Sequence, residues 1–244
     1  MTCGHRAALS LKRFYRYVDV AQNDKKQYLV SLDGRRIKTP LGNLFTVASE
    51  PLALAVMQEW DSQMFRVDMN RMHLTSLCIT AIDNVANQTT DNIVDEILKF
   101  FDNDTLFFMC LRPEGLSELQ KWRWGTMIDW AKVIINVHAD YDTIMRYFSA
   151  YGFDALIGCS YAAEVLKSVL LLLALMEGRI TVEEAVDLTT LEQQFQMKTW
   201  GRVEWAHDVE FHEMCSRLGA AMTFIYFSTN SQSTSKVSTD TKLE

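Results

Sequence analysis

Apolar and polar residues alternate along the first part of the chain and then take up the spacing of helices. The alternating runs are rich in aromatic and β-branched side chains, which pack well on a sheet. Asp33-Gly34 separates two of these runs, and this dipeptide favours the tight turn of a β-hairpin. Strands are therefore predicted over residues 14–20, 28–32, 35–39 and 44–47.

Helical spacing begins after Ser49. Ser49 is a good helix cap, and Glu50 and Pro51 suit the first turn that follows it. The apolar face of this helix is formed by Leu52, Val56, Trp60 and Met64. Further helices are predicted over residues 75–85, 91–101, 114–137, 153–177, 181–199 and 203–227.

The helix predicted over residues 153–177 is apolar on nearly every side, which is typical of a central, buried helix. Gly178 fits the left-handed position that commonly ends a helix. Thr181 and Glu184 have the spacing of a capping box, which starts the next helix.

These elements predict an α+β fold with a small N-terminal β domain followed by a larger all-helical C-terminal domain. We expect a leader over residues 1–12, a β-rich domain with one helix over 13–70 and a helical domain over 71–228. Residues 229–244 are polar, so we expect a disordered tail. The first 18 residues contain four basic residues and no acidic residue, a composition that fits either a mitochondrial transit peptide or a plain basic N-terminus.

Composition excludes several classes of function. The 24 basic and 31 acidic residues give a net charge of −7, which argues against general nucleic-acid binding. The five cysteines contain no Cys-x-x-Cys pair, so a structural zinc site is not expected. No P-loop or Gly-rich dinucleotide turn is present, so we expect no nucleotide or other cofactor. The longest strongly apolar run, residues 168–176, is too short to span a bilayer, so no stable membrane insertion is expected.

The segment from residue 200 to residue 210 holds the most concentrated chemistry in the chain. If the last helix begins near Val203, then Glu204 and His207 fall on the same stripe as Phe211 and Leu218. A carboxylate and an imidazole on such a stripe form either a paired polar group of the core or a site. Glu204-x-x-His207 is also half of a di-iron motif, so a metal-binding helical bundle is the alternative hypothesis, although no second half is present.

Several short blocks, taken in order along residues 13–227, resemble a known family of proteins. The blocks are 13–15, 32–35 with 38–40, 59–63, 72–77 with 82–83, 166–168 and 200–208. Together they are similar to the mitochondrial ATP synthase F(1) assembly factor family, the chaperone of the F(1) alpha subunit. The resemblance implies a non-enzymatic chaperone without cofactors in the mitochondrial matrix, which holds the unassembled alpha subunit until the beta subunit replaces it. The chain departs from the family pattern at residues 107–109 and 124–126, and the segment near 138–147 is shorter.

The resemblance also implies roles for individual residues. We expect Glu204 first, and then Asp208, Trp205 and Glu210, to contact the partner. The residue pattern itself indicates structural roles for Trp60, in the apolar face of its helix, and for Asp33 and Gly34, in the hairpin turn. Structural roles are also expected for Trp200, Gly201 and His207. Glu204 has two possible counterparts, a basic side chain of its own fold or a basic group on the alpha subunit, and we favour the second.

Overall fold

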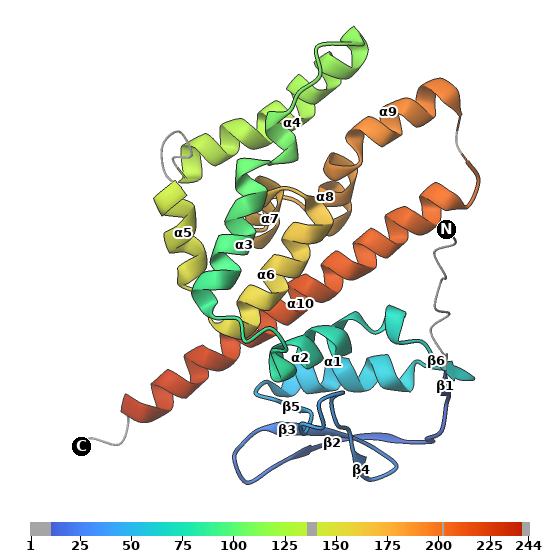
Figure 1. The fold of residues 1–244 in the computed structure, drawn as a ribbon, viewed down its shortest axis with the longest axis vertical. Helices are drawn as coiled ribbons and strands as arrows, with labels where there is room; N and C mark the ends of the chain where they lie inside the picture. The colour runs from blue at the N-terminus through green and yellow to red at the C-terminus, as the bar shows by residue number, and fades with distance from the viewer. Residues whose placement is uncertain (1–10, 136–140, 202, 241–244) are drawn as a thin grey trace. The chain divides into compact units, whose positions relative to one another are not determined.

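The structure is a computed structural model that describes residues 11–135, 141–201 and 203–240. The chain forms two compact units, Met1–Asn84 and Val85–Glu244. The first contains a small antiparallel sheet with helices, and the second is helical (Figure 1). This confirms the predicted α+β fold, with a small N-terminal β region ahead of a larger helical part.

The first unit is built on a four-stranded antiparallel sheet. Its strands are β2 (Val18–Gln22), β3 (Tyr28–Leu32), β4 (Arg35–Arg36) and β5 (Thr46–Val47), with both β4 and β5 paired to β3. Asp33 and Gly34 have φ angles of 48° and 76°, so the predicted hairpin turn is confirmed. The Asp33 carboxylate accepts hydrogen bonds from the backbone amides of Tyr17 and Arg16 at 2.9–3.1 Å, which lowers the pKa of Asp33.

Helix α1 (Glu50–Asp61) packs against this sheet, and helix α2 (His73–Asp83) packs against α1 (Figure 1). Glu59 of α1 accepts hydrogen bonds from the amides of Leu74 and Thr75, at 2.8 and 2.7 Å, and so satisfies the first turn of α2. At the other end of α2, Asp83 accepts a hydrogen bond from the Thr39 hydroxyl at 2.5 Å. Since both ends of α2 are bonded to the β-rich unit, the predicted boundary at residue 70 is wrong, and the unit extends to Asn84.

A second, two-stranded sheet joins the start of the described chain to the segment after α1. Strand β1 (Leu11–Lys12) pairs with β6 (Arg66–Val67), followed by a short 3-10 helix, η1 (Met69–Arg71). Next to β1, the Arg13 guanidinium donates to the Asp61 carbonyl at 2.9 Å and to the Gln63 carbonyl, and it forms an ion pair with the Asp61 carboxylate at 3.1 Å. The predicted leader therefore includes two residues of a strand, and residues 1–10 lie outside the described residues. Because α1 ends at Asp61, Met64 is exposed and does not extend the apolar face.

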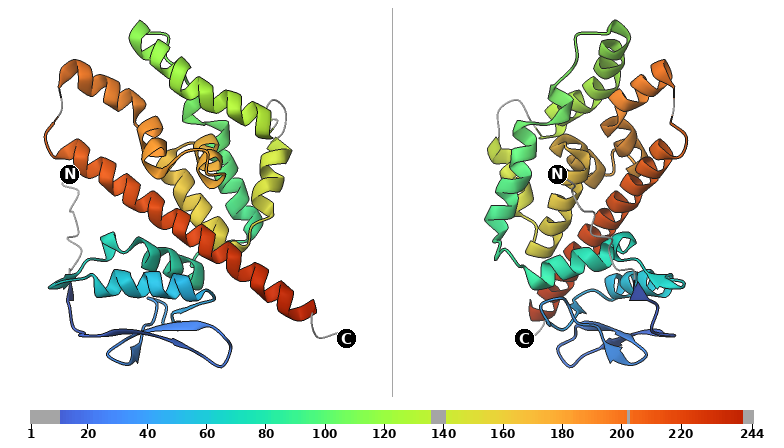
Figure 2. Two further views of the ribbon diagram at one scale, coloured as in Figure 1. Left: turned by 180° about the vertical axis from the view of Figure 1, so that it is seen from behind. Right: turned by 45° about the vertical axis from the view of Figure 1, so that its right-hand side comes forward.

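The second unit is an assembly of helices. They are α3 (Thr90–Asp102), η2 (Thr105–Phe107), α4 (Glu114–Ile135), α5 (Tyr141–Ser149), α6 (Phe153–Leu166), α7 (Val169–Met176), α8 (Val182–Thr189), α9 (Leu191–Trp200) and α10 (Ala206–Asp240). All residues of α7 except Met176 are buried, so this short helix forms the centre of the core. Helix α10 runs along α6 in both views of Figure 2. No helix within the described ranges is long and apolar enough to cross a membrane.

The central helix predicted over residues 153–177 is two helices. Lys167 has a φ angle of 53°, and the Ser168 side chain accepts a hydrogen bond from Leu171 N, so a new helix begins there. The carboxylate of Asp104, which is fully buried, accepts a hydrogen bond from Leu170 N at 3.0 Å, and burial raises the pKa of Asp104. A partner 66 residues earlier thus stabilises the break, which helical periodicity alone does not show.

The other helix boundaries are a mixture of confirmed and corrected predictions. Gly178 has a φ angle of 66°, and both hydrogen bonds of the Thr181–Glu184 capping box are present, so these two signals are confirmed. The helix predicted over residues 181–199 is divided between α8 and α9 at Thr190, and α5 was not predicted. The predicted disordered tail is helical as far as Asp240, since no Gly or Pro between residues 229 and 240 ends α10, while residues 241–244 lie outside the described residues.

Candidate functional site

Most of the residues that the sequence analysis selected lie in or beside the turn between α9 and α10. Gly201 caps α9 with a φ angle of 92°, and its amide donates to the Met197 carbonyl at 2.9 Å. Trp205 also has a positive φ angle, 71°, and α10 begins directly after it. The Trp205 carbonyl accepts the amide of Val209 at 3.0 Å, which closes the first turn of α10. The chain therefore reverses between the two helices (Figure 1).

Glu204 lies in this turn and not on the last helix. The predicted apolar stripe was extended too far toward the N-terminus, because the helix begins at Ala206. The stripe is buried at Leu218 and Ala221, whereas Val203 is exposed. Glu204 is also exposed, and its side chain has no hydrogen-bond or ion-pair partner among the residues that the structure describes. A buried pair between Glu204 and His207 is therefore wrong.

Four large apolar side chains are exposed around the same turn. The exposed fractions are 80% for Trp200, 63% for Val203, 79% for Trp205 and 63% for Val209. Together with Glu204 they form a surface that we call the α9–α10 patch. Single exposed apolar residues are common, but a group that includes two tryptophans is typical of an interaction surface.

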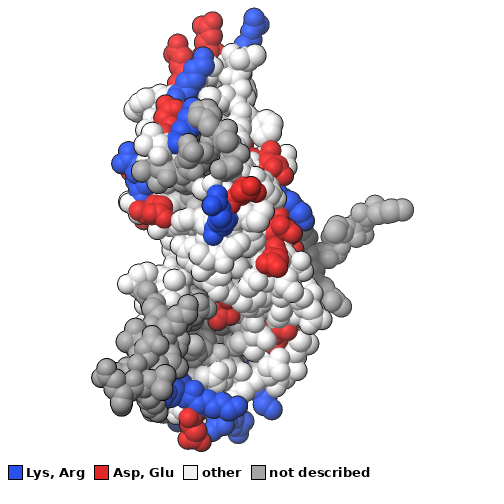
Figure 3. Space-filling view, turned by 90° about the vertical axis from the view of Figure 1, so that its left-hand side faces the viewer, with Lys and Arg blue, Asp and Glu red and all other residues white. Residues whose placement is uncertain are grey.

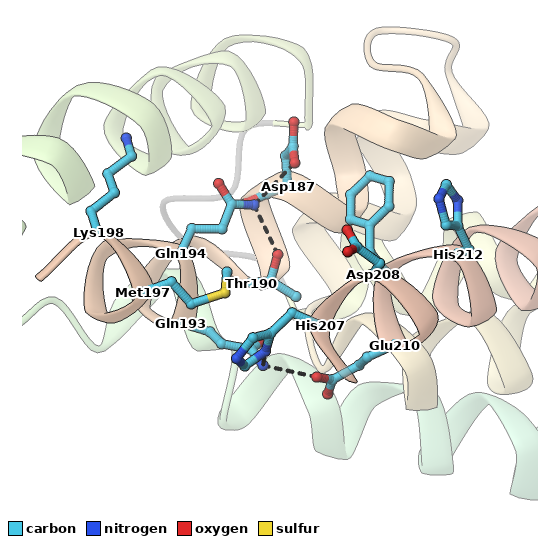
Figure 4. Close-up of a pocket in the computed structure, with 11 residues that line it drawn as sticks. Asp187, Thr190, Gln193, Gln194, Met197, Lys198, His207, Asp208, Glu210 and His212 are labelled. Carbon is cyan, nitrogen blue, oxygen red and sulfur yellow. Dashed lines mark hydrogen bonds between the residues drawn. The ribbon is translucent and has the colours of Figure 1, made fainter. Parts of the chain in front are cut away.

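A cleft of about 540 Å³ lies beside this patch, between α9, the end of α8 and the start of α10. It is lined by Asp187, Thr190, Gln193, Gln194, Met197, Lys198, His207, Asp208, Glu210, Phe211 and His212 (Figure 4). Its polar side chains are linked in two groups. The Gln193 amide nitrogen donates to Glu210 at 2.8 Å and lies 3.2 Å from His207 Nδ1. The Gln194 amide nitrogen donates to the Asp187 carboxylate and to the Thr190 hydroxyl, both at 3.0 Å.

The charge of this cleft is acidic. Asp187, Asp208 and Glu210 line it with one basic residue, Lys198, which points away from Asp208 and Glu210 in Figure 4. Met197 and Phe211 add apolar surface to the same walls. A cleft with carboxylates and an apolar wall suits the side chain of Arg or Lys, whose aliphatic part packs while its cation pairs.

The metal-binding alternative has little support in this geometry. Glu204 and His207 do not share a helix face, because only His207 belongs to α10. His207 Nδ1 already faces the amide of Gln193. Across the described parts of the chain, no group of three or more His, Cys, Asp or Glu side chains could hold a metal ion.

The structure brings together part of the predicted set. His207, Asp208 and Glu210 line the cleft, and Trp200, Glu204 and Trp205 surround its neighbouring turn. Gly201 provides the positive φ angle that ends α9. The other three predicted residues belong to the first unit, where Trp60 is buried and Asp33 and Gly34 form the hairpin turn.

Sequence reasoning missed the wall of the cleft that α9 provides. Gln193, Gln194 and Met197 are spaced at i, i+1 and i+4, so one face of a helix presents them together. That spacing was available in the sequence. The spacing alone does not predict a cleft, because the cleft forms only where the turn brings α10 opposite α9.

Comparison with known proteins identifies the family. Residues 12–132 match the model of the family described as ATP12 chaperone protein. The chain belongs to the ATP12 chaperone family. The matched residues cover most of the first unit together with α3 and most of α4, so the α9–α10 patch of this ATP12 family member lies beyond them.

Relatives match nearly the whole length of this ATP12 family member. Protein atp12, mitochondrial, of Schizosaccharomyces pombe is 24% identical over 87% of this chain and 81% of its own. Protein ATP12, mitochondrial, of Saccharomyces cerevisiae is 23% identical over 89% and 84%. Among solved structures, the Atu1473 protein of Agrobacterium tumefaciens has a TM-score of 0.80 at 28% identity, covering 88% of this chain and 85% of its own. Atp12 of Paracoccus denitrificans has a TM-score of 0.75 at 24% identity, covering 89% and 98%, and shows the same fold.

Proposed function

We propose that this ATP12 family member is a chaperone that binds the unassembled alpha subunit of the mitochondrial F(1)-ATPase and so supports assembly of the catalytic head. The proposal places the protein in the mitochondrial matrix, without nucleotide, cofactor or catalysis. The family match supports the chaperone role. The names of the fungal relatives support the mitochondrial location.

The observation that supports a contact surface is the α9–α10 patch beside its acidic cleft. Exposed Trp200, Trp205 and Val209 offer apolar area that can cover an apolar surface of a subunit that has not yet met its neighbours. The cleft and Glu204 offer carboxylates that fix the register of basic side chains. Apolar contact gives affinity and the charges give orientation, which is the combination that a reversible holder of one subunit needs.

In this proposal Glu204 recognises the partner and does not stabilise the fold. Its side chain is exposed and has no partner among the described residues, so no buried cation depends on it. Glu204→Gln keeps the shape and removes the charge. We expect the free energy of unfolding to change by less than about 0.5 kcal/mol, as for other exposed sites.

The test is a light-scattering assay of isolated alpha subunit, with the full chain added at equimolar ratio and no nucleotide. The wild-type protein is expected to suppress aggregation, and Glu204→Gln to suppress it less at the same concentration. Glu118→Gln is the matched control, because Glu118 is an exposed glutamate on α4.

Two results would count against the proposal. Equal scattering with and without the wild-type protein would contradict the chaperone role toward the alpha subunit. If Glu204→Gln is folded and as effective as Glu118→Gln, then Glu204 takes no part in recognition.

A further inference from the structure

The first unit has a pocket of its own, far along the chain from the α9–α10 patch. It has a volume of about 470 Å³ and is lined by Phe14, Tyr15, Leu32, Asp33, Arg35, Arg36, Ile37, Lys38 and Trp60. The buried members, Tyr15, Leu32, Ile37 and Trp60, are apolar or aromatic. The exposed members include three basic residues, so the pocket combines an apolar floor with a basic rim.

The basic residues of the rim are not paired with acidic residues in the described part of their own fold. Arg35, Arg36 and Lys38 form no ion pair with any residue in the described ranges. The nearby acidic residue, Asp33, is already bonded to the amides of Arg16 and Tyr17. Arg13, which stacks on the Tyr15 ring at 4.6 Å, is likewise held by Asp61. The three rim cations are therefore available to a partner.

Trp60 supplies a second and independent observation. Its side chain is 93% buried, since only 7% is exposed, and it lies against Tyr15 with the ring centroids 5.8 Å apart. Its indole N–H is buried and has no hydrogen-bond acceptor among the described residues. A buried donor without an acceptor is rare and costs stability. Trp60 also lines the pocket, so a molecule seated there changes the surroundings of this ring.

The charge of the two units differs in sign. Residues 1–84 contain 11 basic and 8 acidic residues, whereas residues 85–244 contain 13 basic and 23 acidic residues. Figure 3 shows basic side chains gathered at the sheet of the first unit. The basic character of the pocket thus belongs to the whole first unit, and the acidic cleft to the second, so the two sites suit partner surfaces of opposite charge.

We infer that the pocket of the first unit binds an acidic peptide segment in which an apolar side chain lies between carboxylates. The apolar side chain packs on the floor formed by Leu32, Ile37 and Trp60, and the carboxylates pair with Arg35, Arg36 and Lys38. A nucleic acid fits less well, because three cations around one pocket do not form the extended track that follows a phosphate backbone. The inference goes beyond the proposed function, since it concerns another surface and another charge of partner.

The test uses the full chain and a labelled peptide, Gly-Asp-Glu-Leu-Asp-Glu-Gly, followed by fluorescence anisotropy. The matched neutral peptide is Gly-Asn-Gln-Leu-Asn-Gln-Gly. The charge-reversed variant Arg36→Glu/Lys38→Glu is expected to bind the acidic peptide about tenfold more weakly than wild type. The control Lys25→Glu/Lys26→Glu, with the same change of charge at exposed positions of the first unit away from the pocket, should stay within about twofold.

A second readout follows Trp60 directly. The indole ¹H–¹⁵N signal of Trp60, assigned by its loss in Trp60→Phe, should move when the acidic peptide is added. Equal binding by Arg36→Glu/Lys38→Glu and wild type would overturn the inference. So would equal binding of the neutral peptide, or tighter binding of a single-stranded RNA oligonucleotide than of the acidic peptide. No F(1) subunit is present in this experiment, so its failure leaves the alpha-subunit proposal untouched, and the reverse is also true.

Discussion

The positive φ angle of Trp205 allows stability and recognition to be separated at one residue. Trp205 is 79% exposed and has a φ angle of 71°, a conformation that costs a residue with a side chain roughly 1–2 kcal/mol relative to glycine. Glycine loses more backbone entropy on folding, by about 0.5–1 kcal/mol. We therefore expect Trp205→Gly to be about 0.5–1 kcal/mol more stable than Trp205→Ala, which keeps the strain.

The same two variants should both lose alpha-subunit binding. A tryptophan at the centre of an interface typically costs about 2 kcal/mol when truncated, or roughly 30-fold in the dissociation constant. Urea unfolding followed by circular dichroism gives the stabilities, and titration of labelled alpha subunit gives the affinities. Trp122→Ala is the control, because Trp122 is an exposed tryptophan on α4.

The stability and the binding of these variants are tested separately. If Trp205→Gly is less stable than wild type by more than about 1 kcal/mol, the Trp205 side chain contributes packing that its exposure does not suggest. If both variants are stable and bind the alpha subunit as well as Trp122→Ala does, the α9–α10 patch is not the contact surface. A gain in stability with a loss of binding is the expected pattern, and it would identify the strain as retained for recognition.

Two further predictions concern buried side chains. Trp60→Ala should lower the free energy of unfolding by about 3–5 kcal/mol. Trp60→Phe should lower it by less than half as much, because it keeps a ring against Tyr15 and removes the unpartnered N–H. A Trp60→Ala protein with an unchanged melting temperature would contradict this prediction. Burial raises the pKa of Asp104, so the folded protein favours the protonated carboxyl group. The stability that this protonation contributes is present below the unfolded pKa of about 4 and is lost as pH rises through the folded pKa. The stability of wild type relative to Asp104→Asn should therefore fall across that window in urea unfolding, and a difference that is constant with pH would refute the shift.

Local signals predicted the fold wherever a few neighbouring residues determine the backbone. Asp33-Gly34 forms its hairpin turn, and Thr181 with Glu184 forms its capping box, because the hydrogen bonds and φ angles involved lie within four residues. The break between α6 and α7 could not be predicted in this way. It depends on Asp104, whose partner Leu170 is 66 residues away.

The site was predicted in part for the same reason. Asp208 and Glu210, which are predicted to contact the partner, line the cleft, whereas the predicted position of Glu204 on the last helix is wrong, because helical spacing does not show where a helix begins. Trp205 has a positive φ angle, a conformation that tryptophan rarely adopts, and the apolar stripe of the helix therefore does not extend past this residue. Gln193 was missed, since its role appears only when Glu210 lies opposite it across the turn.

The bonds of Arg13 limit how the N-terminus of this chain can be processed. Arg13 and β1 hold the segment that follows α1, through the Asp61 carboxylate and the pairing of β1 with β6. A protease that removed a leader ahead of residue 11 would leave all of these bonds in place. Cleavage only three residues later would remove Arg13 and leave the last turn of the helix that carries Trp60 without its ion pair. A mature chain that begins at or before Leu11 would therefore keep both the pairing of β1 with β6 and the Arg13 ion pair.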